Sequence, residues 1–175
     1  VKEGRATGLV AEVQTDLERT FDAVTRFVLL ERAELESYPM AILEIALQSY
    51  SWPWRLAIGQ SVSSKVWPTR GIAAGSATAV AELAMMLNQA IKRPNSSLPG
   101  SVTYVHVDDI STTIFADSLE EMEGKAAAVA HMYIEELVIK NGLSLAQDKT
   151  FVISPCKEVA SLVARTANQL GATIA

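Results

Sequence analysis

The feature that most constrains the fold is a pair of adjacent aspartates set between two β-prone segments. Residues 101–107 and 110–115 are rich in β-branched and aromatic side chains, and only Asp108-Asp109 separates them. Two such segments joined by two turn-forming residues are typical of a β-hairpin. Neighbouring carboxylates repel each other, so a half-buried pair at a hairpin tip favours a bound cation. The dipeptide taken alone is also an ordinary hairpin turn, and that interpretation stays open.

A third acidic residue stands at the end of another predicted strand. Residues 8–15 alternate in part between apolar and polar side chains, which predicts a strand leading into Asp16. If this strand lies beside the hairpin, Asp16, Asp108 and Asp109 converge and would hold two Mg²⁺ ions about 3.5–4 Å apart. Carboxylate oxygens suit Mg²⁺, with Mn²⁺ as an alternative. The other interpretation of Asp16 is the N-cap of a helix that starts near it.

The remaining pattern predicts helices interspersed with short strands. Apolar residues recur at helical spacing in four segments, the first of which is broken at Pro39: 22–49, 77–91, 117–140 and 158–169. Short strands are predicted at 55–58, 61–66 and 150–154, and residues 92–100 read as a connector. This order predicts an α+β fold in which helices cover one face of an antiparallel sheet.

Length and composition narrow the classes of function. The 175 residues suffice for one domain with a sizeable core. No apolar run is long enough to span a bilayer, so we expect no membrane partner. A single cysteine excludes an internal disulfide. With only two histidines in addition, the chain has too few Cys and His ligands for a zinc cluster. The net charge of −5 counts against nucleic-acid binding by the whole surface, because phosphate neutralisation needs clustered Lys and Arg.

Four motifs, in order and at suitable spacing, resemble those of reverse transcriptases, most closely the non-retroviral retroelement kind. Each motif occupies its own block of the chain: motif A near 12–24, motif B near 71–80, motif C near 102–112 and motif D near 140–151. The stretches that carry the likeness are Thr15–Val24, Gly71–Ser76, His106–Asp109, and Gly142–Leu145 with Lys149-Thr150. The later stretch Asn168–Gly171 is similar to the Leu-Gly that often follows.

The resemblance implies a single palm domain over residues 1–175, with a palm-like antiparallel sheet. The basic fingers and thumb would be largely absent from this chain. Because its first residue is Val1 and not Met, we expect it to be a piece of a longer polyprotein. The implied activity is RNA-directed DNA polymerisation by two-metal nucleotidyl transfer. Its partners would be an RNA template, a DNA primer and deoxynucleoside triphosphates, in the nucleus or the cytoplasm.

The family roles carry over residue by residue. Asp16, Asp108 and Asp109 match the catalytic metal ligands, and Lys149 would neutralise or protonate the departing pyrophosphate. Three residues match the nucleotide-binding positions: Phe21, Gly75 and Ser76. Phe21 would exclude a ribonucleotide 2′-hydroxyl by volume, and Gly75 would let the backbone approach the incoming base. The alternatives are a core aromatic for Phe21 and a solvated side chain for Lys149.

Two residues depart from the family pattern and keep other functions open. Ala74 stands where Gln is usual, and His106 where Tyr or Phe is usual. A catalytically inactive retroelement-derived domain that binds RNA or serves as a scaffold is therefore one alternative. An RNA-dependent RNA polymerase palm is another, and a plain α+β domain with turn-forming acids is a third. Trp52, Trp54 and Trp67 would form either a nucleic-acid platform or core and turn material, and we expect the latter.

Overall fold

The computed structural model describes residues 8–175, which cluster into two compact units. The sheet unit comprises residues 8–18 and 87–175, and the helical unit comprises residues 19–86. The prediction of a single palm domain over residues 1–175 stays a prediction.

The sheet unit is built on five strands in the order β4-β5-β1-β6-β7. Their bounds are β1 (Leu9–Thr15), β4 (Ser101–His106), β5 (Asp109–Ala116), β6 (Phe151–Ile153) and β7 (Thr173–Ile174). Central β1 pairs antiparallel with β5 on one side and β6 on the other, β4 and β5 form a hairpin, and β7 runs parallel to β6. The predicted α+β fold with a mostly antiparallel sheet is confirmed.

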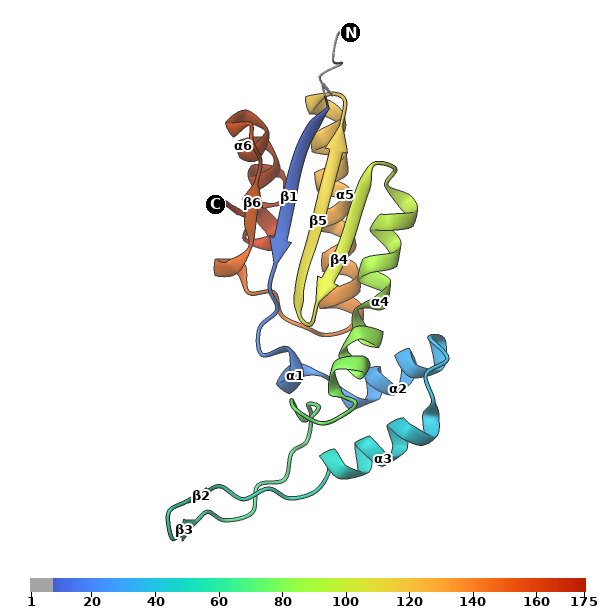
Figure 1. Cartoon of the computed structure of the whole chain (residues 1–175), viewed down its shortest axis with the longest axis vertical. Coiled ribbons are helices and arrows are strands. Elements are labelled where there is room, and N and C mark those ends of the chain that lie inside the picture. The colour runs from blue at the N-terminus through green and yellow to red at the C-terminus, as the bar shows by residue number, and fades with distance from the viewer. Residues whose placement is uncertain (1–7) are drawn as a thin grey trace, which may run out of the picture. The chain divides into compact units, whose positions relative to one another are not determined.

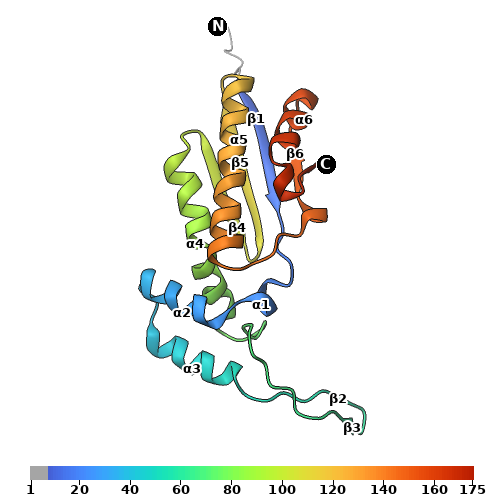
Figure 2. The same ribbon diagram turned by 180° about the vertical axis from the view of Figure 1, so that it is seen from behind.

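Helices cover one face of this sheet and leave the other face open. Along β1, Ala11, Val13 and Thr15 are buried, whereas Glu12 and Gln14 between them are half-buried, the alternation expected of a strand with one covered face. Helices α5 (Leu119–Tyr133) and α6 (Lys157–Thr166) lie behind the sheet in the view of Figure 1 and in front of it in the reverse view of Figure 2. Among the described residues of the sheet unit, no helix covers the opposite face. The core between the two layers is apolar, with Ile110, Ile114, Met122, Val129, Leu137, Val152 and Val163 all buried.

Helix α4 (Ala79–Ser97) is longer than the sequence predicts. The predicted connector 92–100 is wrong over its first half, because the helix continues through Pro94. Proline removes one backbone donor inside a helix, but the last turn gains two other hydrogen bonds. The Asn95 side chain donates to Thr103 O over 2.9 Å and accepts from Thr103 N over 2.6 Å. This amide thus ties the end of α4 to the edge strand β4.

The predicted helix over residues 117–140 begins and ends as expected. Ser118 is its N-cap, and the Ser118 hydroxyl accepts a hydrogen bond from Glu121 N at 3.1 Å. The Glu121 carboxylate in turn accepts from Asp117 N at 2.8 Å, which completes a reciprocal cap. After Tyr133 the helix widens into a π-helical stretch, η1 (Ile134–Lys140), a form that periodicity does not reveal.

Four charged side chains join α4 to η1. Arg93 lies 2.8 Å from Glu135, and Lys140 lies 2.8 Å from Glu135 and 2.7 Å from Glu136, whose side chain is only 2% exposed. Hydrogen bonds from Lys140 and then Arg93 lower the pKa of Glu135 from 4.5 to about 2. The pKa of Glu136 is also lowered: its burial acts in the opposite direction, but the hydrogen bonds and charges of Lys140 and Arg93 outweigh it.

We expect this network to make the sheet unit sensitive to acid. A carboxyl group with a lowered folded-state pKa stabilises the fold above its unfolded pKa, and that contribution is lost as the pH falls through the folded value. Stability should therefore fall between about pH 4.5 and about pH 2. In urea unfolding across this pH window, the free energy of unfolding should fall less steeply with decreasing pH for Arg93→Met than for the parent. Lys157→Met, which removes a charge outside the network, should keep the parent slope. Equal slopes in all three proteins would contradict the assignment.

The helical unit contains three helices, a short hairpin and the first turns of α4. Its elements are α1 (Thr20–Ala23), α2 (Arg26–Leu35), α3 (Met40–Tyr50), β2 (Ala57–Ile58) and β3 (Ser61–Val62). Pro39 separates α2 from α3 as predicted. The Arg26 guanidinium donates to the carbonyls of Tyr50 at 2.7 Å, Pro68 at 3.2 Å and Gly71 at 3.1 Å, which joins the base of the hairpin to α3. None of the helices over residues 8–175 is both long and apolar enough to cross a bilayer.

We expected the three tryptophans to belong to the core or to turns, and the structure shows that they are not in the core. Trp52, Trp54 and Trp67 are 63%, 53% and 64% exposed. The reason is the geometry of the β2–β3 hairpin, which extends away from the helices of its own unit (Figure 1). Its strands are also shorter than the predicted 55–58 and 61–66.

Candidate active site

The two adjacent aspartates lie at the tip of the β4–β5 hairpin. His106 pairs with Asp109, so the loop residues are Val107 and Asp108 rather than the predicted Asp108-Asp109. Val107 has φ of 62°, in the left-handed region that a β-branched side chain disfavours. Such a conformation costs roughly 1–3 kcal/mol and persists where the surrounding structure enforces it. The hairpin thus holds Asp108 and Asp109 next to each other at a strained turn.

Asp16 lies beside this tip. Thr15 is the last residue of β1 and pairs with Ile110 of β5, so the chain continues with Asp16 adjacent to Asp109. Both residues line a hollow of about 430 Å³ together with Lys149 and Tyr104. The prediction that the strand before Asp16 lies beside the hairpin is confirmed.

Both carboxylate oxygens of Asp16 accept hydrogen bonds. Oδ1 accepts from Leu17 N at 2.7 Å, and Oδ2 accepts from Lys149 Nζ at 2.8 Å. The Asp16 side chain is 18% exposed. The alternative role as a helix N-cap is wrong, because α1 has Arg19 at its N-cap position. Asp16 therefore faces the hollow as an oriented carboxylate.

A segment from the far end of the chain brings Lys149 to this position. Ser144 O accepts from Glu18 N and Ala146 N donates to Asp16 O, both over 2.9 Å, and a β-bridge joins Leu17 to Leu145. The 3₁₀ turn η2 (Gln147–Lys149) follows directly. The chain that continues β1 thus pairs with residues 144–146, and the turn after them delivers the lysine.

The Lys149 ammonium is stabilised by its surroundings. Its pKa is raised, first by the hydrogen bond with Asp16, then by the charge of Asp16, with further contributions from Asp148 and Asp108. Asp108 is therefore close enough to act on the same ammonium group. Lys149 is 62% exposed, so its side chain has room to leave Asp16 for another anion.

The chemistry of the donor set fits a hard divalent cation, because the hollow presents the carboxylate oxygens of Asp16 and Asp109 and no sulfur or imidazole. Within residues 8–175, no three His, Cys, Asp or Glu side chains lie close enough together to hold a metal ion between them. The set Asp16, Asp108 and Asp109 therefore stays a prediction.

The three residues assigned to nucleotide binding lie in the helical unit. Phe21, in α1, is half-buried, and its carbonyl accepts from Ile72 N at 2.9 Å. Gly75 is exposed with φ of 91°, a conformation that favours glycine. The Ser76 hydroxyl accepts from Ala79 N at 3.1 Å, in the first turn of α4. Phe21 and the loop 71–76 are thus joined through backbone contacts.

Gly71 explains why this loop approaches Phe21 so closely. A Cβ at Gly71 would lie 3.1 Å from the carbonyl oxygens of both Phe21 and Asp22, and its φ of 85° is left-handed. Only glycine meets both conditions without displacing the backbone.

Sequence reasoning missed a buried polar pair below this loop. The Tyr50 hydroxyl donates to Glu82 Oε2 at 2.8 Å and shares a hydrogen bond of 2.7 Å with the Ser76 hydroxyl. Glu82 is fully buried, and its Oε1 has no hydrogen-bond partner. The sequence did contain a signal for this pair, because Glu82 interrupts the apolar face of the helix predicted over residues 77–91. In the sheet unit, Gln14 of β1 was missed, and it lines the same hollow as Asp16.

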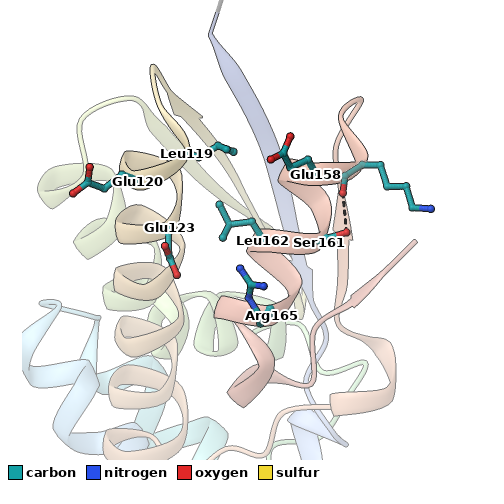
Figure 3. Close-up of a pocket in the computed structure, with 8 residues that line it drawn as sticks. Leu119, Glu120, Glu123, Glu158, Ser161, Leu162 and Arg165 are labelled. Carbon is teal, nitrogen blue, oxygen red and sulfur yellow. Dashed lines mark hydrogen bonds between the residues drawn. The ribbon is translucent and has the colours of Figure 1, made fainter.

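A second hollow lies among the helices of the sheet unit and contains none of the predicted site residues. It measures about 740 Å³ and lies between α5 and α6. Figure 3 shows Leu119 and Leu162 pointing into it, with Glu123 and Arg165 projecting from opposite sides. Its lining does not add to the candidate active site.

Comparisons with known proteins find similar folds among solved structures only. No protein-family model and no curated protein sequence matches the chain significantly. Solved structures that share its fold include telomerases from Candida tropicalis. The apo form has a TM-score of 0.62 at 10% identity, over 88% of this chain and 30% of that chain. The complex with a TWJ fragment of telomeric RNA has a TM-score of 0.62 at 10% identity, over 89% and 27%.

A third structure, of apo telomerase truncated from its C-terminal domain, has a TM-score of 0.57 at 13% identity, over 83% of this chain and 31% of that chain. At these identities the likeness establishes the fold alone. The chain shares the fold of part of these telomerases and spans about three-tenths of their length. The expected non-retroviral retroelement type stays a prediction.

Proposed function

We propose that this chain is the catalytic part of an RNA-directed DNA polymerase, which extends a DNA primer on an RNA template with deoxynucleoside triphosphates. The observation that carries the proposal is the juxtaposition of Asp16 and Asp109 in one hollow, with Lys149 Nζ 2.8 Å from Asp16. The RNA in one of the similar telomerase structures supports an RNA partner. The fingers and thumb would come from other segments of a longer polyprotein.

Asp16, Asp108 and Asp109 would hold two Mg²⁺ ions, or Mn²⁺ in their place. Bound there, the metal pair would supply charge stabilisation to the attacking and leaving oxygens of nucleotidyl transfer. The protein's part is largely positioning. Leu17 N orients Oδ1 of Asp16, and Ala146 N holds the Asp16 carbonyl, so the carboxylate keeps its direction.

Lys149 would donate a proton to the departing pyrophosphate or neutralise its charge. A lysine is protonated at neutral pH, and the contact with Asp16 raises the pKa of Lys149 further, so the ammonium group is available to the departing pyrophosphate. Its exposure allows Nζ to exchange Asp16 for a phosphate oxygen. Phe21 would exclude a 2′-hydroxyl by volume, and Gly75 and Ser76 would contact the nucleotide.

A second candidate function is an inactive domain that binds RNA. Ala74 replaces the glutamine usual at this position of the family. This departure favours a domain that no longer catalyses nucleotide addition.

The test is extension of a DNA primer on an RNA template by a protein that carries this chain with its flanking sequence. We expect extension with deoxynucleotides in Mg²⁺ or Mn²⁺, its loss in chelator, and its loss in Asp108→Asn. A preference for ribonucleotides would assign the protein to RNA synthesis instead. RNA binding without any templated incorporation by the parent would favour the inactive domain.

A further inference from the structure

The longest exposed segment of the helical unit has an unusual composition. We call residues 51–70, which include the β2–β3 hairpin, the arm. The arm carries three positive charges, Arg55, Lys65 and Arg70, and no acidic residue, in a chain whose net charge is −5. The basic surface that the composition lacks as a whole is therefore present locally.

The arm also exposes large apolar side chains. Besides its three tryptophans, Leu56 and Ile58 are 66% and 71% exposed. Contiguous exposed apolar groups of this size mark a binding surface, because a soluble chain otherwise keeps them from water. Three indole rings in twenty residues are suited to stacking on planar partners.

Hydrogen bonds hold the arm in an ordered shape before any partner binds. Trp54 and Val66 exchange two backbone hydrogen bonds, of 2.8 and 2.9 Å, and Ser63 N donates to Leu56 O at 2.8 Å. At the base, Arg26 holds the carbonyls of Tyr50 and Pro68. A preformed surface loses less conformational entropy on binding than a mobile one does.

We propose that the arm binds single-stranded nucleic acid, with bases stacking on Trp52 and Trp67 and phosphates contacting Arg55 and Lys65. A positive surface with interleaved aromatic rings is the combination that binds single strands without reading their sequence. A neutral protein partner would account for the exposed rings but not for the three positive charges. The choice of a nucleic acid as partner rests on the proposed function, whereas the arm itself contains none of the predicted catalytic residues.

The experiment measures binding of a fluorescein-labelled twelve-nucleotide oligouridylate by anisotropy, as a function of salt. Stacking on an aromatic ring contributes about 1–3 kcal/mol per base, so Trp52→Ala/Trp67→Ala should weaken binding by at least about tenfold. Removing two phosphate contacts in Arg55→Gln/Lys65→Gln should make the slope of log K against log salt shallower by about 1.4.

A matched control comes from exposed apolar residues elsewhere in the same unit. Phe27 and Leu35 on α2 are 67% and 74% exposed, so Phe27→Ala/Leu35→Ala should bind as the parent does. Circular dichroism and the fluorescence of the remaining Trp54 establish that the tryptophan variant is folded. Arg55→Gln/Lys65→Gln alters only exposed side chains. It therefore tests the proposal even if the tryptophan variant fails to fold.

Unchanged affinity and unchanged salt slope in both arm variants would overturn the proposal. So would sedimentation data in which the tryptophan variant dissociates a dimer while its nucleic-acid affinity stays at the parent level, because the arm would then be a protein interface. Asp108→Asn should bind the oligonucleotide normally. Arm-dependent binding by a protein that shows no templated extension would therefore disprove only the polymerase activity.

Discussion

Replacing Asp16 by Asn is expected to lower RNA-templated primer extension by on the order of 10³-fold. The substitution keeps the size of the side chain and leaves Oδ1 able to accept from Leu17 N, so the fold should persist. It removes the negative charge that faces Asp109 and Lys149 in the hollow, and with it the charge that would hold a divalent ion. The measurement is kcat for single-nucleotide incorporation in saturating Mg²⁺.

The same variant has a readout that does not depend on catalysis. Because Asp16 is the main cause of the raised pKa of Lys149, Asp16→Asn should move that pKa down toward the ordinary lysine value of 10.5, measured by NMR of the Nζ group. The control is Asp148→Asn, which also removes a negative charge near Lys149 but lies outside the predicted metal set. It should leave kcat within a few-fold of the parent. Similar activity in Asp16→Asn and in the parent would contradict the assigned role of Asp16.

Gly171→Ala is expected to destabilise the sheet unit by about 3 kcal/mol. A Cβ at this position would lie 2.4 Å from both the Cβ and the carbonyl oxygen of Gln147, and Gly171 has φ of 77°. Forcing a methyl group into a packed site costs about 1–3 kcal/mol, and a left-handed alanine costs about 1–2 kcal/mol. Denaturant unfolding followed by circular dichroism measures the total.

This glycine also connects the C-terminal segment to the active site. Gln147 begins the turn η2 that carries Lys149, so the displaced turn should weaken the contact with Asp16 and lower the pKa of Lys149. Gly142→Ala is the matched control, because Gly142 has a similar φ of 65° but no atom within 4 Å of the added Cβ. It should cost only about 1 kcal/mol and leave Lys149 unchanged. Equal losses in the two variants would show that the close approach at Gly171 has no energetic consequence.

The predictions from sequence succeeded where a signal is local. The β-prone segments around Asp108 became the hairpin β4–β5, the segment before Asp16 became β1, and the helix predicted over residues 117–140 formed behind its Ser118 cap. Each of these follows from side-chain periodicity or from the hydrogen-bonding of a single residue with its near neighbours. The continuation of α4 through Pro94 was missed because the compensating bonds of Asn95 go to another element.

The candidate acids were identified from sequence by their places at strand ends and by motif likeness, and Lys149 by motif likeness alone. The sequence shows the residue types but not the register that sets Asp16 next to Asp109, which is a property of β1–β5 pairing. Likewise, the contact between Lys149 and Asp16 joins residues 133 positions apart. The exposure of Trp52 and its neighbours was predicted wrongly, since an apolar composition favours burial but does not say whether another layer is present to cover it.

The sequence by itself determined the strands β1, β4, β5 and β6, the break between helices at Pro39 and the α+β class, because these depend on residues within one or two turns of each other. The tertiary structure decided which carboxylates share a hollow, that Lys149 reaches Asp16, and that the tryptophans of the arm face solvent. The physical reason is that these features depend on strand register and on the packing of distant segments, whose energies no single stretch of chain encodes.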